Sequence, residues 1–197
     1  MNDQPSSRRK ELERIRRVSD MLCSGHATLR DRYSRHALLL DLTILGLSTW
    51  LVALAFVQPR IGLSLTPFRL DPALWVGLLA IGTFFMSLIQ IKVDWKKRSD
   101  AHRLSCSMYA DVHREVGSAL ASANEFVEEE YRRLLARYDM ATASSVELQE
   151  RSFLPLKKRH MLKIAISKRL DTHPGASITM TRVRFWLKDN FGRGEGP

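Results

Sequence analysis

The chain has few of the residues that cross-link small folds or bind zinc. Only two of its 197 residues are cysteine, Cys23 and Cys106, and neither has a partner at the spacing of zinc ligands. A disulfide-rich scaffold and a cysteine-based zinc site are therefore excluded. Both cysteines fall in regions that we place in the reducing cytosol below, so we expect no structural disulfide.

Motifs for catalysis and cofactor binding are also missing. The sequence has no HExxH motif and no nucleophile elbow, and the glycines of GRGEGP form a tail rather than a phosphate-binding turn. His102 and His113 share a predicted helix face, but no third ligand follows them at a useful spacing. We therefore expect no enzymatic activity, no cofactor and no metal site.

Two long apolar runs are present instead, Ala37–Val57 and Ala73–Ile91. The first contains one ionisable residue, Asp41, and the second contains none. Each is close to the roughly 20 residues that a helix needs to cross a bilayer. Two buried helices of a soluble protein are the alternative, but a chain of this length has too little other apolar surface to cover both. The sequence therefore predicts two membrane-spanning helices.

The distribution of basic residues predicts the orientation of these helices. The short connection Gln58–Pro72 carries only Arg60 and Arg69, whereas the outer flanks are richer in basic residues: Arg17, Arg30, Arg32, Arg35, Lys92, Lys96, Lys97, Arg98 and Arg103. By the positive-inside rule both termini lie in the cytoplasm. The first run starts too far from Met1 to be a cleaved signal peptide. We expect an antiparallel hairpin with a small outer loop.

Polar residues inside the apolar runs are few. Asp41 lies about one turn inside the first span, at the depth that Gln90 and Lys92 share in an antiparallel hairpin. Asp41 either lines a polar path at the cytoplasmic mouth of an oligomeric pore, or has a structural role in which it snorkels to the interface or pairs with Lys92. Small residues that suit helix packing, within one hairpin or between subunits, are Thr49, Ala53, Ala73 and Gly77.

The first flank, residues 1–36, is predicted to contain an amphipathic helix. Its narrow apolar stripe comprises Leu12, Ile15, Val18 or Ser19, and Leu22. Because the stripe lacks Trp and Phe anchors, we expect it to pack on the protein's own helices rather than on lipid. Ser24-Gly25 is a predicted break in this segment.

The flank after the second run, residues 92–140, is predicted to form one long cytoplasmic helix. Apolar residues recur in steps of three and four, as in a coiled coil: Tyr109, Val112, Val116, Leu120, Ala123, Val127, Tyr131, Leu134 and Tyr138. Its partner is either the N-terminal helix or the same helix of another subunit. Cys23 and Cys106 are each about fourteen residues outside their span, so both are expected at a similar height above the bilayer.

The last segment, residues 141–197, is strongly basic, with eleven Lys or Arg against five Asp or Glu. Pro155 is expected to break or restart a helix there, and the stretch from Ser177 to Gly192 reads as a short strand or a final helix. A basic amphipathic helix between them offers a surface for the anionic lipid leaflet or for an anionic trigger, through Lys157, Lys158, Arg159, Lys163, Lys168 and Arg169.

The arrangement resembles the SLATT domain, a two-transmembrane effector family associated with SMODS nucleotidyltransferases and SLOG proteins in bacterial conflict systems. The similarity covers about residues 8–140 and rests on this architecture and on scattered residues: Arg32-Tyr33, Lys92, Asp94-Trp95-Lys96, His102, Tyr109 and Glu115. The resemblance implies an effector in the bacterial inner membrane that perturbs the bilayer or forms a pore on a nucleotide or infection signal. It also implies partners such as a nucleotide-signal synthase or a reverse transcriptase, and it transfers no catalytic residue.

The predicted fold class is therefore an all-α membrane protein, with a two-transmembrane antiparallel hairpin over residues 37–91, a long cytoplasmic helical extension and a small basic C-terminal region. The predicted function is a homo-oligomeric membrane effector of antiphage defence. The alternative is a non-conducting membrane scaffold whose basic region recruits a nucleic acid or a protein. Charge-neutralising changes at Asp41 distinguish the two, because only a pore predicts altered conductance.

Overall fold

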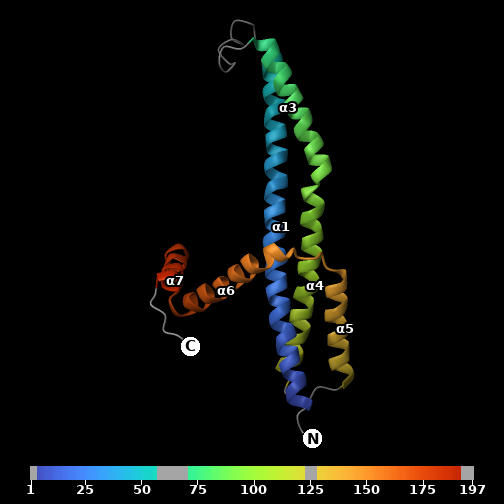
Figure 1. The fold of residues 1–197 in the computed structure, drawn as a ribbon, viewed down its shortest axis with the longest axis vertical. Coiled ribbons are helices and arrows are strands. Elements are labelled where there is room, and N and C mark those ends of the chain that lie inside the picture. Colours follow the sequence, from blue (N-terminus) through green and yellow to red (C-terminus); the bar gives the residue numbers. More distant parts are fainter. Residues whose placement is uncertain (1–3, 57–70, 123–127, 192–197) are drawn as a thin grey trace. The chain divides into compact units, whose positions relative to one another are not determined.

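The computed structural model describes residues 4–56, 71–122 and 128–191, and every element in these ranges is an α-helix (Figure 1). The all-helical fold class is confirmed, and two of the helices contain stretches long and apolar enough to cross a membrane. The predicted outer loop falls almost wholly on residues 57–70, outside the described residues. The helices are α1 (Gln4–Phe56), α3 (Pro72–Val93), α4 (Trp95–Ala121), α5 (Glu128–Ser144), α6 (Glu150–Thr172) and α7 (Ile178–Phe191).

The chain divides into two compact units, of which the first combines two segments that are distant in the sequence. Unit 1 comprises Met1–His26 and Ser105–Pro197, and unit 2 comprises Ala27–Leu104. Helices α1 and α4 contribute to both. The units therefore group residues differently from the four consecutive segments expected from composition, because side-by-side helices share a core regardless of their distance along the chain.

Helix α1 is continuous over 53 residues, so the predicted break at Ser24-Gly25 is wrong. A single glycine costs a helix only about 1 kcal/mol relative to alanine, which packing readily offsets. At Gly25 that packing comes from α6 and the segment before it: a Cβ built on Gly25 would lie 3.6 Å from Leu156 Cδ1 and 3.8 Å from Leu148 Cδ1.

The core of unit 1 joins α1, α4 and α5. Its buried members are Leu12, Ile15, Tyr109, Val112, Val116, Ala119, Leu134 and Ala141. Packing of the N-terminal stripe on the protein's own helices is therefore confirmed. Of the two residues predicted as alternatives at one position of the stripe, Ser19 is buried and Val18 is not. Of the two partners considered for the α4 seam, the structure uses the N-terminal helix.

The single helix expected over residues 92–138 is wrong, because α3 ends at Val93 and α4 ends at Ala121. Near the second end Ser118 Oγ donates to the Glu115 carbonyl and Ser122 Oγ to the Ser118 carbonyl, contacts that weaken a helix by competing for its carbonyls. Helix α5 then packs on α4, where Arg137 forms a 2.6 Å ion pair with Glu115. The expected seam positions Ala123 and Val127 lie outside the described residues.

Helices α6 and α7 form the basic end of the chain. The predicted basic helix is confirmed as α6, but Pro155 lies inside it rather than at a break. Pro155 is in the second turn of α6, so it removes the hydrogen bond to the Arg151 carbonyl, and the helix continues past this loss. The last segment is the helix α7, and the strand alternative is wrong.

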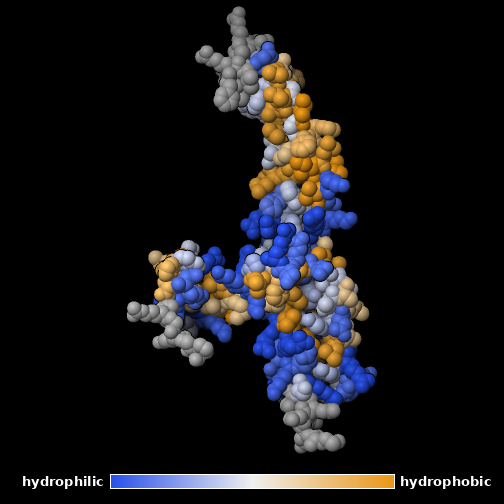
Figure 2. Space-filling view, viewed as in Figure 1, coloured by the Kyte–Doolittle hydropathy of each residue, from blue (hydrophilic) through white to orange (hydrophobic). Residues whose placement is uncertain are grey.

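Unit 2 contains α3, the C-terminal half of α1 and the start of α4. Contacts pair Arg30 with Ser99, His36 with Trp95, and Asp41 with Gln90. Residue numbers rise on one side as they fall on the other, so these two stretches run antiparallel. Figure 2 shows the hydrophobic side chains of unit 2 gathered over α3 and the neighbouring part of α1.

Candidate functional site

The structure brings Asp41 and Gln90 together where the apolar stretches begin and end. Gln90 Nε2 donates a 2.5 Å hydrogen bond to Asp41 Oδ1, and both residues are exposed on the surface of unit 2. Of the contacts predicted among Asp41, Gln90 and Lys92, the structure therefore contains the hydrogen bond between Asp41 and Gln90. Lys92 is also exposed, and within the described ranges its ammonium group forms no ion pair with Asp41 or any other acid.

The junction after Lys92 is a break between α3 and α4 that was not predicted from the sequence. Asp94 has a left-handed backbone with φ of 44°, and its N–H donates to the Gln90 carbonyl as α3 ends. Its Oδ1 accepts a 3.1 Å hydrogen bond from the N–H of Lys97 in the first turn of α4. Aspartate tolerates this backbone better than most residues and is a strong helix cap, which was the available signal.

A layer of aromatic contacts lies beside this junction in unit 2. Tyr33 stacks on His102 with ring centroids 5.5 Å apart, and His36 lies 5.5 Å from Trp95 at a tilt. Ser99 Oγ donates a 3.1 Å hydrogen bond to the Arg30 carbonyl. Burial lowers the pKa of His102 below its ordinary value, so this ring is neutral at pH 7. These contacts hold α1 and α4 together next to the Asp41–Gln90 pair.

The four small residues predicted for helix packing lie on the surface of the described part of the chain. All four are exposed: Thr49, Ala53, Ala73 and Gly77. A Cβ built on Gly77 would meet no heavy atom within 4 Å, and the Thr49 hydroxyl donates to the carbonyl of Leu45 in its own helix. Their faces are thus open to lipid or to another protein chain.

The predicted anionic site on α6 is not one convergent cluster. At 3.6 residues per turn Lys157 and Lys168 share one side of the helix, whereas Arg159 and Lys163 lie on the opposite side. Lys158 is exposed between them, and only Arg169 is half-buried. Helix α7 adds three basic residues that were not predicted as part of the site, Arg182, Arg184 and Lys188. The α6 and α7 pair is a broadly basic surface rather than a pocket.

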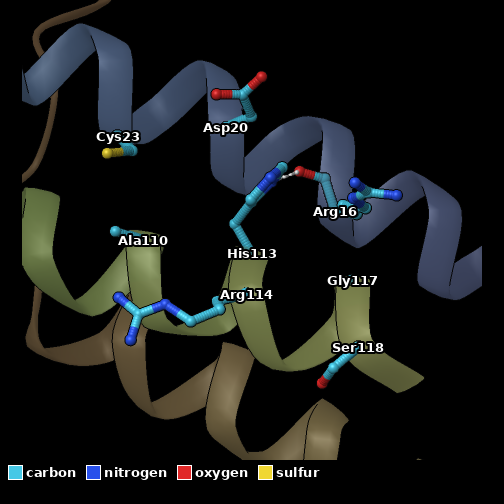
Figure 3. A pocket seen from close by; sticks show the side chains of 8 residues that line it. All are labelled: Arg16, Asp20, Cys23, Ala110, His113, Arg114, Gly117 and Ser118. Atoms are coloured by element: carbon cyan, nitrogen blue, oxygen red, sulfur yellow. Dashed lines mark hydrogen bonds between the residues drawn. The ribbon is translucent and has the colours of Figure 1, made fainter. Parts of the chain in front are cut away.

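A hollow in unit 1 lies between α1 and α4 (Figure 3). Its volume is about 550 Å³, and its lining residues are Arg16, Asp20, Cys23, Ala110, His113, Arg114, Gly117 and Ser118. His113 Nδ1 is 3.1 Å from the Arg16 carbonyl oxygen, and the Arg16 guanidinium lies against Gly117. His113 is thereby held in a helix contact rather than beside His102. No cluster of three or more metal-binding side chains occurs in the described parts of the chain.

The two cysteines meet beside this hollow. Cys23 Sγ of α1 lies 2.9 Å from Cys106 Sγ of α4, and both side chains are half-buried free thiols. Cys23 and Cys106 were expected at a similar distance from the two apolar runs, and in the structure they are in direct contact. Burial, the hydrogen bond to Cys106 and the nearby Asp20 carboxylate raise the pKa of Cys23 to about 12. No family model, curated protein or solved structure matches this chain.

Proposed function

We propose that the protein is a membrane effector whose two apolar helices cross the bacterial inner membrane as an antiparallel hairpin with both termini in the cytoplasm. In this proposal, assembled copies permeabilise the membrane. The observation that carries it is the exposure of apolar side chains along both helices. No described residue of α3 is buried, and in the apolar part of α1 only Leu40 is.

The cost of leaving these side chains in water supports a lipid environment. Fourteen large apolar residues are exposed between Leu38 and Ile91 in the described ranges. At about 1.5 kcal/mol or more for each, exposing them to water would cost roughly 20 kcal/mol. Burial in lipid, assisted by contacts with other copies, removes this cost.

The Asp41–Gln90 pair supports assembly around a polar path. Both side chains are exposed on the hairpin, and a carboxylate that faces lipid is costly even near the interface. An arrangement of several hairpins places this pair toward a shared, wetted centre instead. The open faces of Ala73 and Gly77 suit close approach by a neighbouring helix.

The biological setting comes from the resemblance to the SLATT domain. In that setting the effector acts in a bacterial conflict or antiphage system, and a nucleotide or infection signal triggers it. The bundle of unit 1 would carry the signal to the spans, because α1 and α4 each run from one unit into the other.

The test is a measurement of membrane potential by dye fluorescence in bacteria that express the chain from an inducible promoter. Asp41→Asn removes the charge but keeps the size of the side chain and the hydrogen bond from Gln90. Asp100→Asn is a matched control, because Asp100 is an exposed acid of unit 2 outside the apolar stretches. We expect the wild type and Asp100→Asn to depolarise the cells equally, and Asp41→Asn to change the depolarisation.

Other outcomes separate the alternatives. Equal depolarisation by the wild type, Asp41→Asn and Asp100→Asn would support a pore in which Asp41 has only a structural role. An unchanged potential, despite confirmed insertion and co-expression of candidate signal-producing enzymes, would contradict the effector. It would favour a scaffold that recruits a nucleic acid or protein through the basic surface of α6 and α7.

A further inference from the structure

The contact between Cys23 and Cys106 brings together the chain's only two thiols from positions 83 residues apart. Their sulfur atoms are 2.9 Å apart, whereas a disulfide bond is about 2.05 Å long. The two atoms therefore need to approach by less than about 1 Å to bond.

The surroundings allow a small reagent to reach this pair. Cys23 lines the hollow of about 550 Å³ between α1 and α4, and both cysteines are half-buried rather than enclosed. The raised pKa of Cys23 keeps its thiol protonated at neutral pH, which slows adventitious oxidation. Proximity, not acidity, is what favours reaction between the two sulfurs.

We propose that Cys23 and Cys106 are a reversible modification site, at which a hydroperoxide converts the two thiols to an intrachain disulfide that fastens α1 to α4. One thiol gives up its proton to water as its sulfur attacks the peroxide oxygen; an alcohol or water leaves, and a sulfenic acid remains on that sulfur. The second sulfur then attacks the sulfenic sulfur and releases water. Two electrons pass from the thiols to the peroxide, and cellular thiols reverse the step by exchange.

The position of the bond gives it a structural effect. It closes a loop that contains residues 24–105, and this loop holds the whole of unit 2, Ala27–Leu104. Oxidation therefore links α1 to α4 covalently, at the positions just before and just after the segment that forms unit 2. This inference concerns the thiols alone and does not depend on whether the hairpin conducts.

The test uses the full chain in isolated membranes treated with hydrogen peroxide. After denaturation, free thiols are counted by labelling with a polyethylene-glycol maleimide, and the intact mass is measured. We expect the labelled thiols to fall from two to none, the mass to fall by two hydrogen atoms, and the chain to remain monomeric on a non-reducing gel. A thiol reductant should restore both labels.

A matched control exchanges two neighbouring residues, Cys106→Ser with Ser107→Cys. Ser107 is exposed, so the thiol moves off the α1-facing side while the composition is unchanged. Its intrachain disulfide should form at least about tenfold more slowly. Equal rates for both proteins, disulfides formed only between chains, or oxygen added to each sulfur without a cross-link would each overturn the proposal.

Discussion

Truncation of Leu134 tests the finding that α5 packs back on α1 and α4 within one chain. The Leu134 side chain is 1% exposed and belongs to the same buried cluster as Leu12, Ile15 and Val116. Leu134→Ala removes three carbon groups, worth about 0.8 kcal/mol each, and leaves a cavity that adds to the loss. We expect the free energy of unfolding of unit 1 to fall by about 3 kcal/mol.

The native thiols provide the assay. Cys23 and Cys106 are half-buried in unit 1, so their rate of maleimide labelling in urea, under reducing conditions, reports its opening. Met140→Ala is the control, because Met140 is on α5 but 63% exposed, and we expect a change within about 0.5 kcal/mol. Equal effects of the two substitutions would refute the packing. A loss that disappears at high protein concentration would indicate that α5 packs between chains instead.

Three further predictions concern single residues. Asp94→Ala should destabilise unit 2 by about 1–2 kcal/mol, because alanine loses the cap and disfavours the left-handed backbone, whereas Asp94→Asn should be nearly neutral; urea unfolding in nanodiscs measures both. Gly25→Ala should raise the thermal midpoint measured by calorimetry, because alanine gains about 1 kcal/mol of helix propensity and its Cβ makes only ordinary contacts, the nearest at 3.6 Å. A lower midpoint would mean that α1 and α6 lie closer together at Gly25 than this distance indicates. The lowered pKa of His102 means that the unfolded chain binds the proton first as pH falls below about 6.5, so stability should decrease with acidification. His102→Phe should flatten this dependence in thermal unfolding, and an unaltered slope would contradict the assignment.

The sequence predicted the features that depend on local pattern. The two apolar runs, the N-terminal stripe and the basic α6 helix each follow from the spacing or run length of apolar and charged residues. The meeting of Asp41 and Gln90 followed from counting residues at equal depth along two antiparallel helices. These properties are set by the helical repeat, which the sequence displays directly.

Features that depend on a partner were harder to predict. The seam from Tyr109 to Tyr138 has the same pattern whether it packs on another subunit or folds back on its own chain, so the division into α4 and α5 was missed. The turn at Asp94 was missed because one left-handed residue is enough to end a helix without proline or glycine. The surface that Gly77 faces was also not predictable, because small residues alone do not identify their partner, and no described atom lies within 4 Å of a Cβ built there.

The most direct test of the central claim is the accessibility of single cysteines from the two sides of the membrane. In a Cys23→Ser, Cys106→Ser background, spheroplasts are labelled with a membrane-impermeant maleimide before and after permeabilisation. Arg69→Cys, in the predicted outer loop, should be labelled in intact spheroplasts, whereas Ser7→Cys and Asn190→Cys should be labelled only after permeabilisation. Protection of Arg69→Cys in intact spheroplasts, or labelling of Asn190→Cys there, would contradict a hairpin with both termini in the cytoplasm.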